Sequence, residues 1–107
     1  MEFETAVRHD IPIVCVICND QGWGMVKHSQ EICYADDRVC GTELGVIHYE
    51  KIVEALGGFG EFVDKDEDIE PAMRRALDCG KPACVNVITD PTVTSPATMM
   101  FAQSFSF

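Results

Sequence analysis

The chain contains two apolar runs of strand length. Residues 11–18 read Ile-Pro-Ile-Val-Cys-Val-Ile-Cys, and residues 82–88 read Pro-Ala-Cys-Val-Asn-Val-Ile. Short apolar runs that are bounded by turn residues predict strands buried on both faces of a sheet. Residues 59–63, between a glycine pair and an acidic turn, predict a third, shorter strand.

Between these runs, apolar residues recur three and four positions apart, which is typical of amphipathic helices. This spacing predicts helices at residues 1–9, 48–56 and 69–79, and residues 25–32 are compatible with a further short helix. The positions expected to face inward on the two later helices are Tyr49, Ile52, Val53, Leu56, Ile69, Met73, Ala76 and Leu77.

Alternating helices and strands predict parallel strands joined by crossover helices. We therefore expect an α/β fold, a parallel sheet inside a three-layer sandwich. Three strands are few for a sheet covered on both faces, and a helix starts at residue 1 with no capping residue before it. These two features suggest a fragment of a longer protein.

The charge balance narrows the choice of partners. The net charge is −10, with 18 acidic and 8 basic residues. Phosphate contacts require clustered lysine and arginine, so we expect neither nucleic acid nor an anionic membrane as a partner. No segment has the length of a membrane span. Glu2, Glu4 and Arg8 interrupt any signal-peptide core, which favours a cytoplasmic protein.

The six cysteines do not predict a metal or disulfide site. Cys15 and Cys18 form a C-x-x-C by count, but residues three apart in a strand point to opposite faces of the sheet. Reduced thiols packed as small apolar side chains are the expected state inside a cell.

Candidate chemistry follows the first strand. Asn19 and Asp20 offer hard oxygen ligands of the kind that Mg²⁺ prefers, and Gly22 would let a backbone carbonyl approach a metal closely. The free amides at the start of the next helix suit a phosphate. This pattern indicates half of a site for Mg²⁺ with a diphosphate. The same residues are also compatible with an ordinary turn.

The sequence resembles the C-terminal pyrophosphate-binding module of thiamine-diphosphate-dependent enzymes, nearest to the acetolactate synthase group. The resemblance is carried in order by residues 1–9 (MEFETAVRH), 11–14 (IPIV) and 19–28 (NDQGWGMVKH), and later by residues 49–57 (YEKIVEALG) and 82–96 (PACVNVITDPTVTSP). In that family the cofactor motif opens with Gly-Asp-Gly and closes with Asn-Asn or Asn-Asp. This chain matches the closing pair, and the opening Gly-Asp-Gly is missing.

The resemblance implies specific roles in binding thiamine diphosphate and Mg²⁺. Asp20 is implied as the side-chain metal ligand, Gly22 as the carbonyl ligand and Asn19 as a support of the turn. Gly24, Met25 and Val26 would lie near the diphosphate or the thiazolium ring. The full cofactor-binding set is Asn19, Asp20, Gln21, Gly22, Trp23, Gly24, Met25 and Val26.

For two residues near the turn, the sequence is compatible with two roles each. Trp23 either lines the cofactor pocket or covers the core, and His28 is either a polar group near the substrate or an exposed helix histidine. The resemblance implies no catalytic residue in this chain, because in that family the glutamate that activates the cofactor belongs to a different domain. Ser29 stands where acetolactate synthases commonly carry Trp, four positions after Met25.

The resemblance predicts a fragment of an enzyme that acts on 2-keto acids as a decarboxylase or carboligase. Residues 1–90 would be the partial module and residues 91–107 an exit segment. The missing N-terminal domains and a dimeric or tetrameric parent are the expected partners, and the isolated chain should be inactive. The alternative is a non-catalytic flavodoxin-like module or partner-binding subunit, in which residues 19–20 are only a turn.

Overall fold

The computed structural model describes residues 1–34 and 38–104, with the backbone alone for residues 101–103. The last part of the predicted exit segment, residues 105–107, lies outside the described residues. The chain forms two compact units. Unit 1 comprises residues 1–19 and 48–89, and unit 2 comprises residues 20–47 and 90–107.

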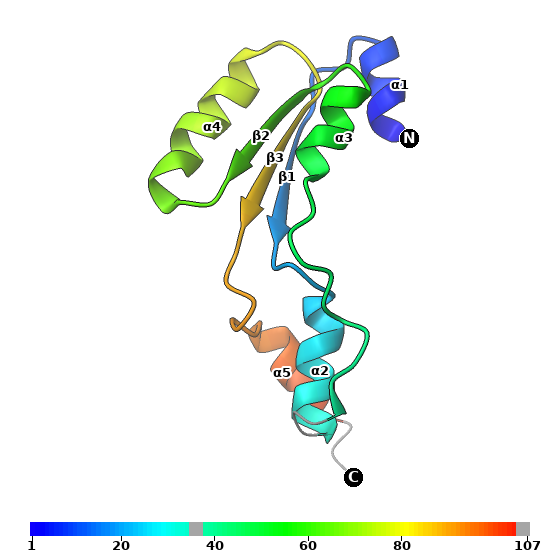
Figure 1. Cartoon of the computed structure of the whole chain (residues 1–107), viewed down its shortest axis with the longest axis vertical. Helices are drawn as coiled ribbons and strands as arrows, with labels where there is room; N and C mark the ends of the chain where they lie inside the picture. The colour runs from blue at the N-terminus through cyan, green and yellow to red at the C-terminus, as the bar shows by residue number, and fades with distance from the viewer. Residues whose placement is uncertain (35–37, 105–107) are drawn as a thin grey trace. The chain divides into compact units, whose positions relative to one another are not determined.

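Unit 1 is built on a parallel sheet of three strands in the order β1-β3-β2 (Figure 1). The strands are β1 (Val14–Asn19), β2 (Phe59–Val63) and β3 (Ala83–Ile88). Ala83 of the central strand is in register with Val14 on one side and Phe59 on the other. All three predicted strands are therefore present, and their parallel pairing confirms the α/β class.

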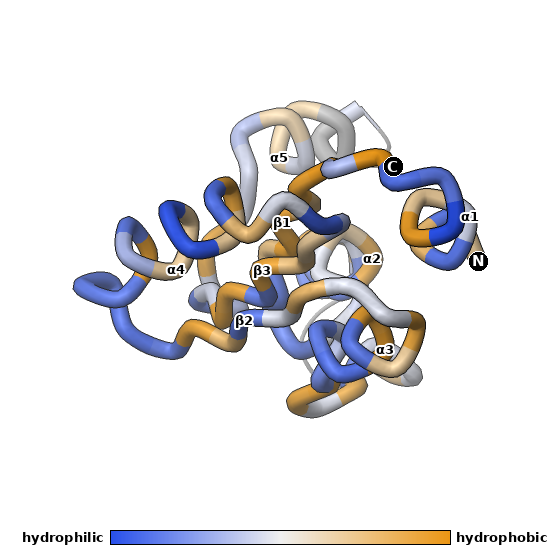
Figure 2. Tube along the Cα trace, turned by 90° about the horizontal axis from the view of Figure 1, so that it is seen from above, coloured by the Kyte–Doolittle hydropathy of each residue, from blue (hydrophilic) through white to orange (hydrophobic). Residues whose placement is uncertain are grey.

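Helices cover both faces of this sheet. Helix α4 (Asp66–Asp78) lies on one face, and α1 (Glu2–Arg8) and α3 (Tyr49–Ala55) lie on the other, as Figures 1 and 2 show from two directions. The three predicted helices of this unit are thus confirmed. Together with the sheet they form the expected three layers.

The core of unit 1 lies between β3 and α4. All of β3 is buried except its last residue, and Val85 has no exposed surface. Alanines four positions apart, Ala72 and Ala76, let α4 approach the sheet closely. The buried cluster consists of Val63, Ala72, Ala76, Ala83, Val85 and Val87. The central strand therefore matches the prediction of a strand buried on both faces.

The same prediction is wrong for β1. Val16 is 45% exposed and Cys18 is also exposed, because β1 is an edge strand of the described sheet. The expected burial of the cysteines is correspondingly wrong for several of them. Cys84 on β3 is buried, whereas Cys33 and Cys40 are exposed like Cys18.

The inward faces of two helices also differ from the prediction. Helix α3 buries Glu50 with Val53, while Ile52 is 56% exposed. Helix α4 buries Ala72 and Ala76, and Leu77 on the expected face is 65% exposed. The small side chains of Ala72 and Ala76 let that side of α4 lie against the sheet, so Leu77 is turned toward solvent. In α3, a buried polar network described below draws Glu50 inward.

Unit 2 contains α2 (Gly24–Tyr34), which exceeds the compatible range 25–32, and α5 (Pro96–Gln103), which pack together. Helix α5 was not predicted, since residues 91–107 were expected to be an exit segment. A capping signal is nevertheless present in the sequence: Ser95 Oγ accepts a hydrogen bond from Thr98 N at 3.2 Å, and proline occupies the first helical position. No helix in the described part of the chain is long and apolar enough to cross a membrane.

Candidate functional site

Strand β1 ends at a buried asparagine in unit 1. Asn19 is 6% exposed, and its Nδ2 donates a hydrogen bond to Oδ1 of Asn86 on β3 at 3.1 Å. Asn86 Nδ2 in turn donates to Glu50 Oε2 on α3 at 2.7 Å. Parallel pairing of β1 with β3 brings the two asparagines together near the carboxyl ends of their strands.

Glu50 is an almost fully buried carboxylate, 1% exposed. Burial alone would raise its pKa, but hydrogen bonds from Asn86, from its own backbone amide and from His48 hold the pKa of Glu50 below its ordinary value of 4.5. His48 Nδ1 lies 2.7 Å from Glu50 Oε1, and the imidazole packs against the Phe62 ring at a centroid distance of 4.8 Å. Glu50 is therefore ionised at neutral pH inside the fold.

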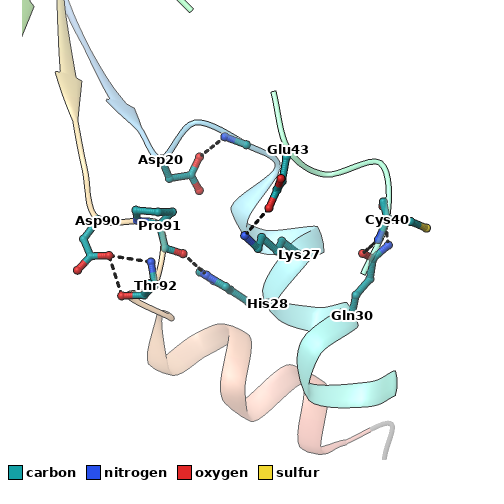
Figure 3. Close-up of polar contacts among 10 residues, drawn as sticks. Asp20, Lys27, His28, Gln30, Cys40, Glu43, Asp90, Pro91 and Thr92 are labelled. Atoms are coloured by element: carbon teal, nitrogen blue, oxygen red, sulfur yellow. Dashed lines mark hydrogen bonds and ion pairs between the residues drawn. The ribbon is translucent and has the colours of Figure 1, made fainter. Parts of the chain in front are cut away.

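The turn that starts unit 2 is organised by the carboxylate of Asp20 (Figure 3). Its Oδ1 accepts a hydrogen bond from Gly22 N at 3.2 Å, and Gln21 between them has a φ of +62°. Its Oδ2 lies against Gly24 at the start of α2, where a Cβ atom would overlap it. Glycine at position 24 thus leaves the space that the Asp20 carboxylate occupies.

Gly22 pairs with Glu43 in an isolated antiparallel bridge. Trp23 N donates to Thr42 O at 2.8 Å, and Leu44 N donates to Gln21 O at 2.9 Å. A Cβ on Gly22 would lie 2.6 Å from Thr42 O, so the bridge requires glycine here. In this pairing geometry the N–H and C=O of Gly22 both point away from residue 43. The N–H points to Asp20 Oδ1, its hydrogen-bond acceptor, and the C=O points to the same side.

Three apolar residues of the predicted cofactor-binding set lie exposed beside the turn. Trp23 is 59% exposed, Met25 76% and Val26 50%. Trp23 therefore does not cover the core of the described chain, and its place at a cofactor pocket stays a prediction. Exposed apolar side chains next to a polar turn are suited to contact a ring system.

A small cavity of about 190 Å³ adjoins Asp20 in unit 2. Lys27 of α2 lies at this cavity, with its Nζ 3.2 Å from Glu43 Oε1 (Figure 3). The lining residues are Asp20, Gln21, Lys27, Glu43, Gly45 and Pro91. Oxygen atoms and one amino group thus share the space beside the turn.

His28 is buried, 6% exposed, which overturns its alternative as an exposed helix histidine. Its Nε2 lies 2.8 Å from the carbonyl oxygen of Pro91 (Figure 3). Because a carbonyl only accepts, Nε2 carries the hydrogen. The next turn is held by Asp90, whose Oδ1 accepts hydrogen bonds from Thr92 N and Oγ1. His28 therefore ties α2 to the segment at residues 90–92.

Residues 1–87 match the profile of a family described as thiamine pyrophosphate enzyme, C-terminal TPP binding domain. The chain belongs to this family. Membership confirms the resemblance to thiamine-diphosphate enzymes and identifies thiamine diphosphate as the cofactor of the family. It also favours the enzyme-fragment interpretation over the flavodoxin-like alternative.

Curated relatives of the chain include an acetolactate synthase large subunit of Mycobacterium tuberculosis, 44% identical over 96 residues. This alignment covers 90% of the chain and 17% of the relative. A 2-hydroxyacyl-CoA lyase 1 of Mus musculus is 33% identical, covering 91% of the chain and 18% of that protein. A sulfoacetaldehyde acetyltransferase of Alcaligenes xylosoxydans is 38% identical, covering 73% and 13%. The chain thus spans less than a fifth of the length of these relatives.

The residues at the turn fit one side of a metal-diphosphate site. A carboxylate at Asp20 and a carbonyl at Gly22 are hard oxygen donors, and Gly24 keeps the carboxylate in place over the first turn of α2. The described ranges contain no group of three or more His, Cys, Asp or Glu side chains that could hold a metal.

Sequence reasoning found this turn but missed the polar network of unit 1. Glu50 was not among the positions that periodicity predicts to face inward, because a charged residue carries no signal of burial. The signal that was available is Asn86, a single amide inside an otherwise apolar buried strand. A buried amide requires hydrogen-bonding partners, and here Glu50 and Asn19 provide them.

Proposed function

We propose that the chain is the closing half of the Mg²⁺-diphosphate site of a thiamine-diphosphate-dependent enzyme that acts on 2-keto acids. The observation that carries this proposal is the Asp20 carboxylate, which accepts a hydrogen bond from Gly22 N and lies against Gly24, in a turn within the residues that the family profile matches. Asp20 supplies the side-chain ligand and Gly22 the carbonyl ligand. Asn19, Gln21 and the residues up to Val26 complete the binding segment.

The chain's own residues bind and orient, and the bound cofactor supplies the carbanion chemistry. Trp23, Met25 and Val26 present apolar surface to the cofactor, and Lys27 lies at the adjoining cavity, where its charge would favour an anionic group. Residues 1–90 are proposed as the partial module and residues 91–107 as its exit segment, which contains α5.

The names of the relatives support the reaction class. They include a synthase, a lyase and an acetyltransferase, and the highest identity given above is to an acetolactate synthase. We therefore favour decarboxylation of a 2-keto acid. The resulting carbanion equivalent would then be passed to a proton or to the carbonyl carbon of a second substrate. The intact enzyme is proposed to be a cytoplasmic homo-oligomer that contains the missing domains.

Calorimetry on the intact enzyme tests the metal assignment. Thiamine diphosphate should bind only with Mg²⁺, and Asp20→Ala should weaken this binding on the order of 100-fold, because the metal loses its carboxylate ligand. Asp78→Ala, which removes an exposed carboxylate at the end of α4 and outside the turn, is the matched control. Unchanged Mg²⁺-dependent binding in Asp20→Ala would overturn the assignment. The purified 107-residue chain should not consume pyruvate with added cofactor and Mg²⁺.

A further inference from the structure

Lys27 and Glu43 form an ion pair at the cavity beside Asp20. Lys27 Nζ lies 3.2 Å from Glu43 Oε1, and both residues line this cavity of about 190 Å³ (Figure 3). All three residues belong to unit 2. Of the residues that line the cavity in the described part of the chain, Lys27 alone carries a positive charge. An anionic group that entered this space would therefore compete with Glu43 for the ammonium.

The backbones of the two residues are fixed beside the turn. Glu43 pairs with Gly22 in the isolated bridge, and Lys27 N donates a hydrogen bond to Trp23 O at 2.9 Å at the start of α2. The side chains differ in exposure: that of Lys27 is 25% exposed, whereas that of Glu43 is 81% exposed. The Lys27 stem is thus held against the protein, while the Glu43 carboxylate is largely hydrated. If the pair opens, Glu43 is the partner that can move away.

The pair is weak enough to be exchanged. An ion pair with such an exposed carboxylate gains little, because water already solvates the charge. Glu43 accepts one hydrogen bond from Lys27, and an ammonium has three N–H donors. Hydrogen bonds from an ammonium to a charged phosphate are among the stronger ones in proteins. The exchange of a hydrated carboxylate for such an oxyanion is therefore favourable.

The surroundings leave space for this movement. Lys27 and Glu43 also line a second, larger cavity of about 360 Å³ in unit 2. Glu43 can therefore turn toward open space without displacing packed side chains. Its departure also removes a negative charge that would repel the entering anion.

We propose that Lys27 binds an oxyanion in the cavity beside Asp20, and that Glu43 is the partner which Lys27 gives up on binding. This inference rests on the proposed function, which assigns a diphosphate to the neighbourhood of Asp20. In the empty site Glu43 holds the ammonium at the cavity, and it lowers the affinity for the anion by competing for Lys27. The same chemistry suits the diphosphate of the cofactor and the carboxylate of a 2-keto acid. These two sources are separated by the order in which cofactor and substrate protect Lys27.

Acetylation of Lys27 by acetic anhydride, read by mass spectrometry, follows the ion pair without measuring activity. In the 107-residue chain, Glu43→Gln should raise the rate at Lys27 about two- to threefold, because the ion pair no longer shields the amine. Glu54→Gln, which breaks the similar exposed pair with Lys51, should raise the rate at Lys51 and leave Lys27 unchanged. An unchanged rate at Lys27 in Glu43→Gln would overturn the proposal.

In the intact enzyme, a bound oxyanion should protect Lys27 from acetylation. Protection by thiamine diphosphate with Mg²⁺ assigns the anion to the cofactor. Protection that appears only when pyruvate is added as well assigns the anion to the substrate carboxylate. Either result supports exchange at Lys27, and a rate that changes in neither case contradicts it.

Calorimetry with the same enzyme tests the competition. For a diphosphate at Lys27, Lys27→Gln should weaken Mg²⁺-dependent binding of thiamine diphosphate about tenfold, and Glu43→Gln should strengthen it about threefold. The gain from Glu43→Gln should vanish in a Lys27→Gln background, and Glu54→Gln should change nothing. For a substrate carboxylate, the same pattern should appear in the KM for pyruvate instead. A gain that persists without Lys27, or no gain in either quantity, would overturn the proposal.

Asp20→Ala separates this inference from the proposed function. If Asp20→Ala loses Mg²⁺-dependent binding but Lys27→Gln alters neither the cofactor affinity nor the KM, the exchange is wrong and the proposed function stands. Mg²⁺-dependent binding that survives Asp20→Ala would overturn the proposed function and the exchange with it.

Discussion

Two carboxylates of this chain have opposite surroundings. Glu50 in unit 1 is buried and accepts hydrogen bonds at both oxygens, from Asn86 and from His48. Asp20 in unit 2 is partly exposed, with one oxygen held by Gly22 N and the other lying over Gly24 beside a cavity. A carboxylate whose oxygens are both engaged inside the fold fixes its neighbours, whereas one with an open side can bind a ligand. The comparison favours a structural role for Glu50 and supports the proposed metal ligation by Asp20.

Removing a partner of the buried carboxylate should give the largest effect. Asn86→Val suits a central strand but leaves Glu50 Oε2 without its amide donor. We expect the chain to lose about 3 kcal/mol of its free energy of unfolding, because a buried charge is then incompletely paired. Urea denaturation of the chain measures this loss. Lys51→Gln, which breaks only the exposed pair with Glu54, is the control and should leave the midpoint unchanged.

A methyl group at position 24, beside the Asp20 carboxylate, should weaken cofactor binding without lowering the stability of the fold. In Gly24→Ala the new Cβ would overlap Asp20 Oδ2, so the carboxylate must turn away. Helix α2 itself tolerates alanine well. We expect affinity of the intact enzyme for Mg²⁺ with thiamine diphosphate to fall roughly tenfold, with little change in the melting temperature. Ser29→Ala on the same helix is the control, and equal affinities of the two variants would contradict the role of Gly24.

His28 tests whether unit 2 depends on a single buried contact. His28→Ala removes the hydrogen bond to Pro91 O and leaves space in the unit. We expect unit 2 to lose about 1–3 kcal/mol of its free energy of unfolding. The contact between α2 and residues 90–92 should be weakened most. Amide hydrogen exchange at Thr92 and along α2 would report it. His9→Ala, at an exposed helix end, should change neither.

The smallest expected effect is on the acid stability of unit 1. The pKa of Glu50 is lowered by folding, so its charge stabilises the fold above the ordinary value of 4.5. This stabilisation is lost as the pH falls through the lower pKa of the folded state. Glu50→Gln should therefore show a shallower loss of stability below pH 4.5 than the unchanged chain. Parallel acid limbs in the two proteins would argue that Glu50 is not charged in the fold.

Much of the fold can be predicted from local pattern. The run at residues 82–88 predicts β3 because a strand buried on both faces must be apolar throughout, and β2 has the predicted bounds. The turn after β1 can be read as a ligand site because its carboxylate and glycines are local in sequence. Family resemblance then adds the cofactor, which no local pattern specifies.

The features that sequence did not predict depend on contacts between distant segments. The exposure of β1 follows from strand order, which periodicity does not contain. The burial of Glu50 follows from Asn86, 36 positions away along the chain. Helix α5 was missed because its signal, Ser95 before a proline, lies in a stretch rich in turn residues.

A change of metal preference tests the central claim, ligation by Asp20, most directly. In the intact enzyme, Asp20→Cys replaces a hard oxygen ligand with a soft sulfur. We predict that thiamine diphosphate binding then fails with Mg²⁺ and is restored by Cd²⁺. The unchanged enzyme, titrated with both metals, controls for its other cysteines. Binding by Asp20→Cys that remains fully supported by Mg²⁺ would contradict ligation by Asp20.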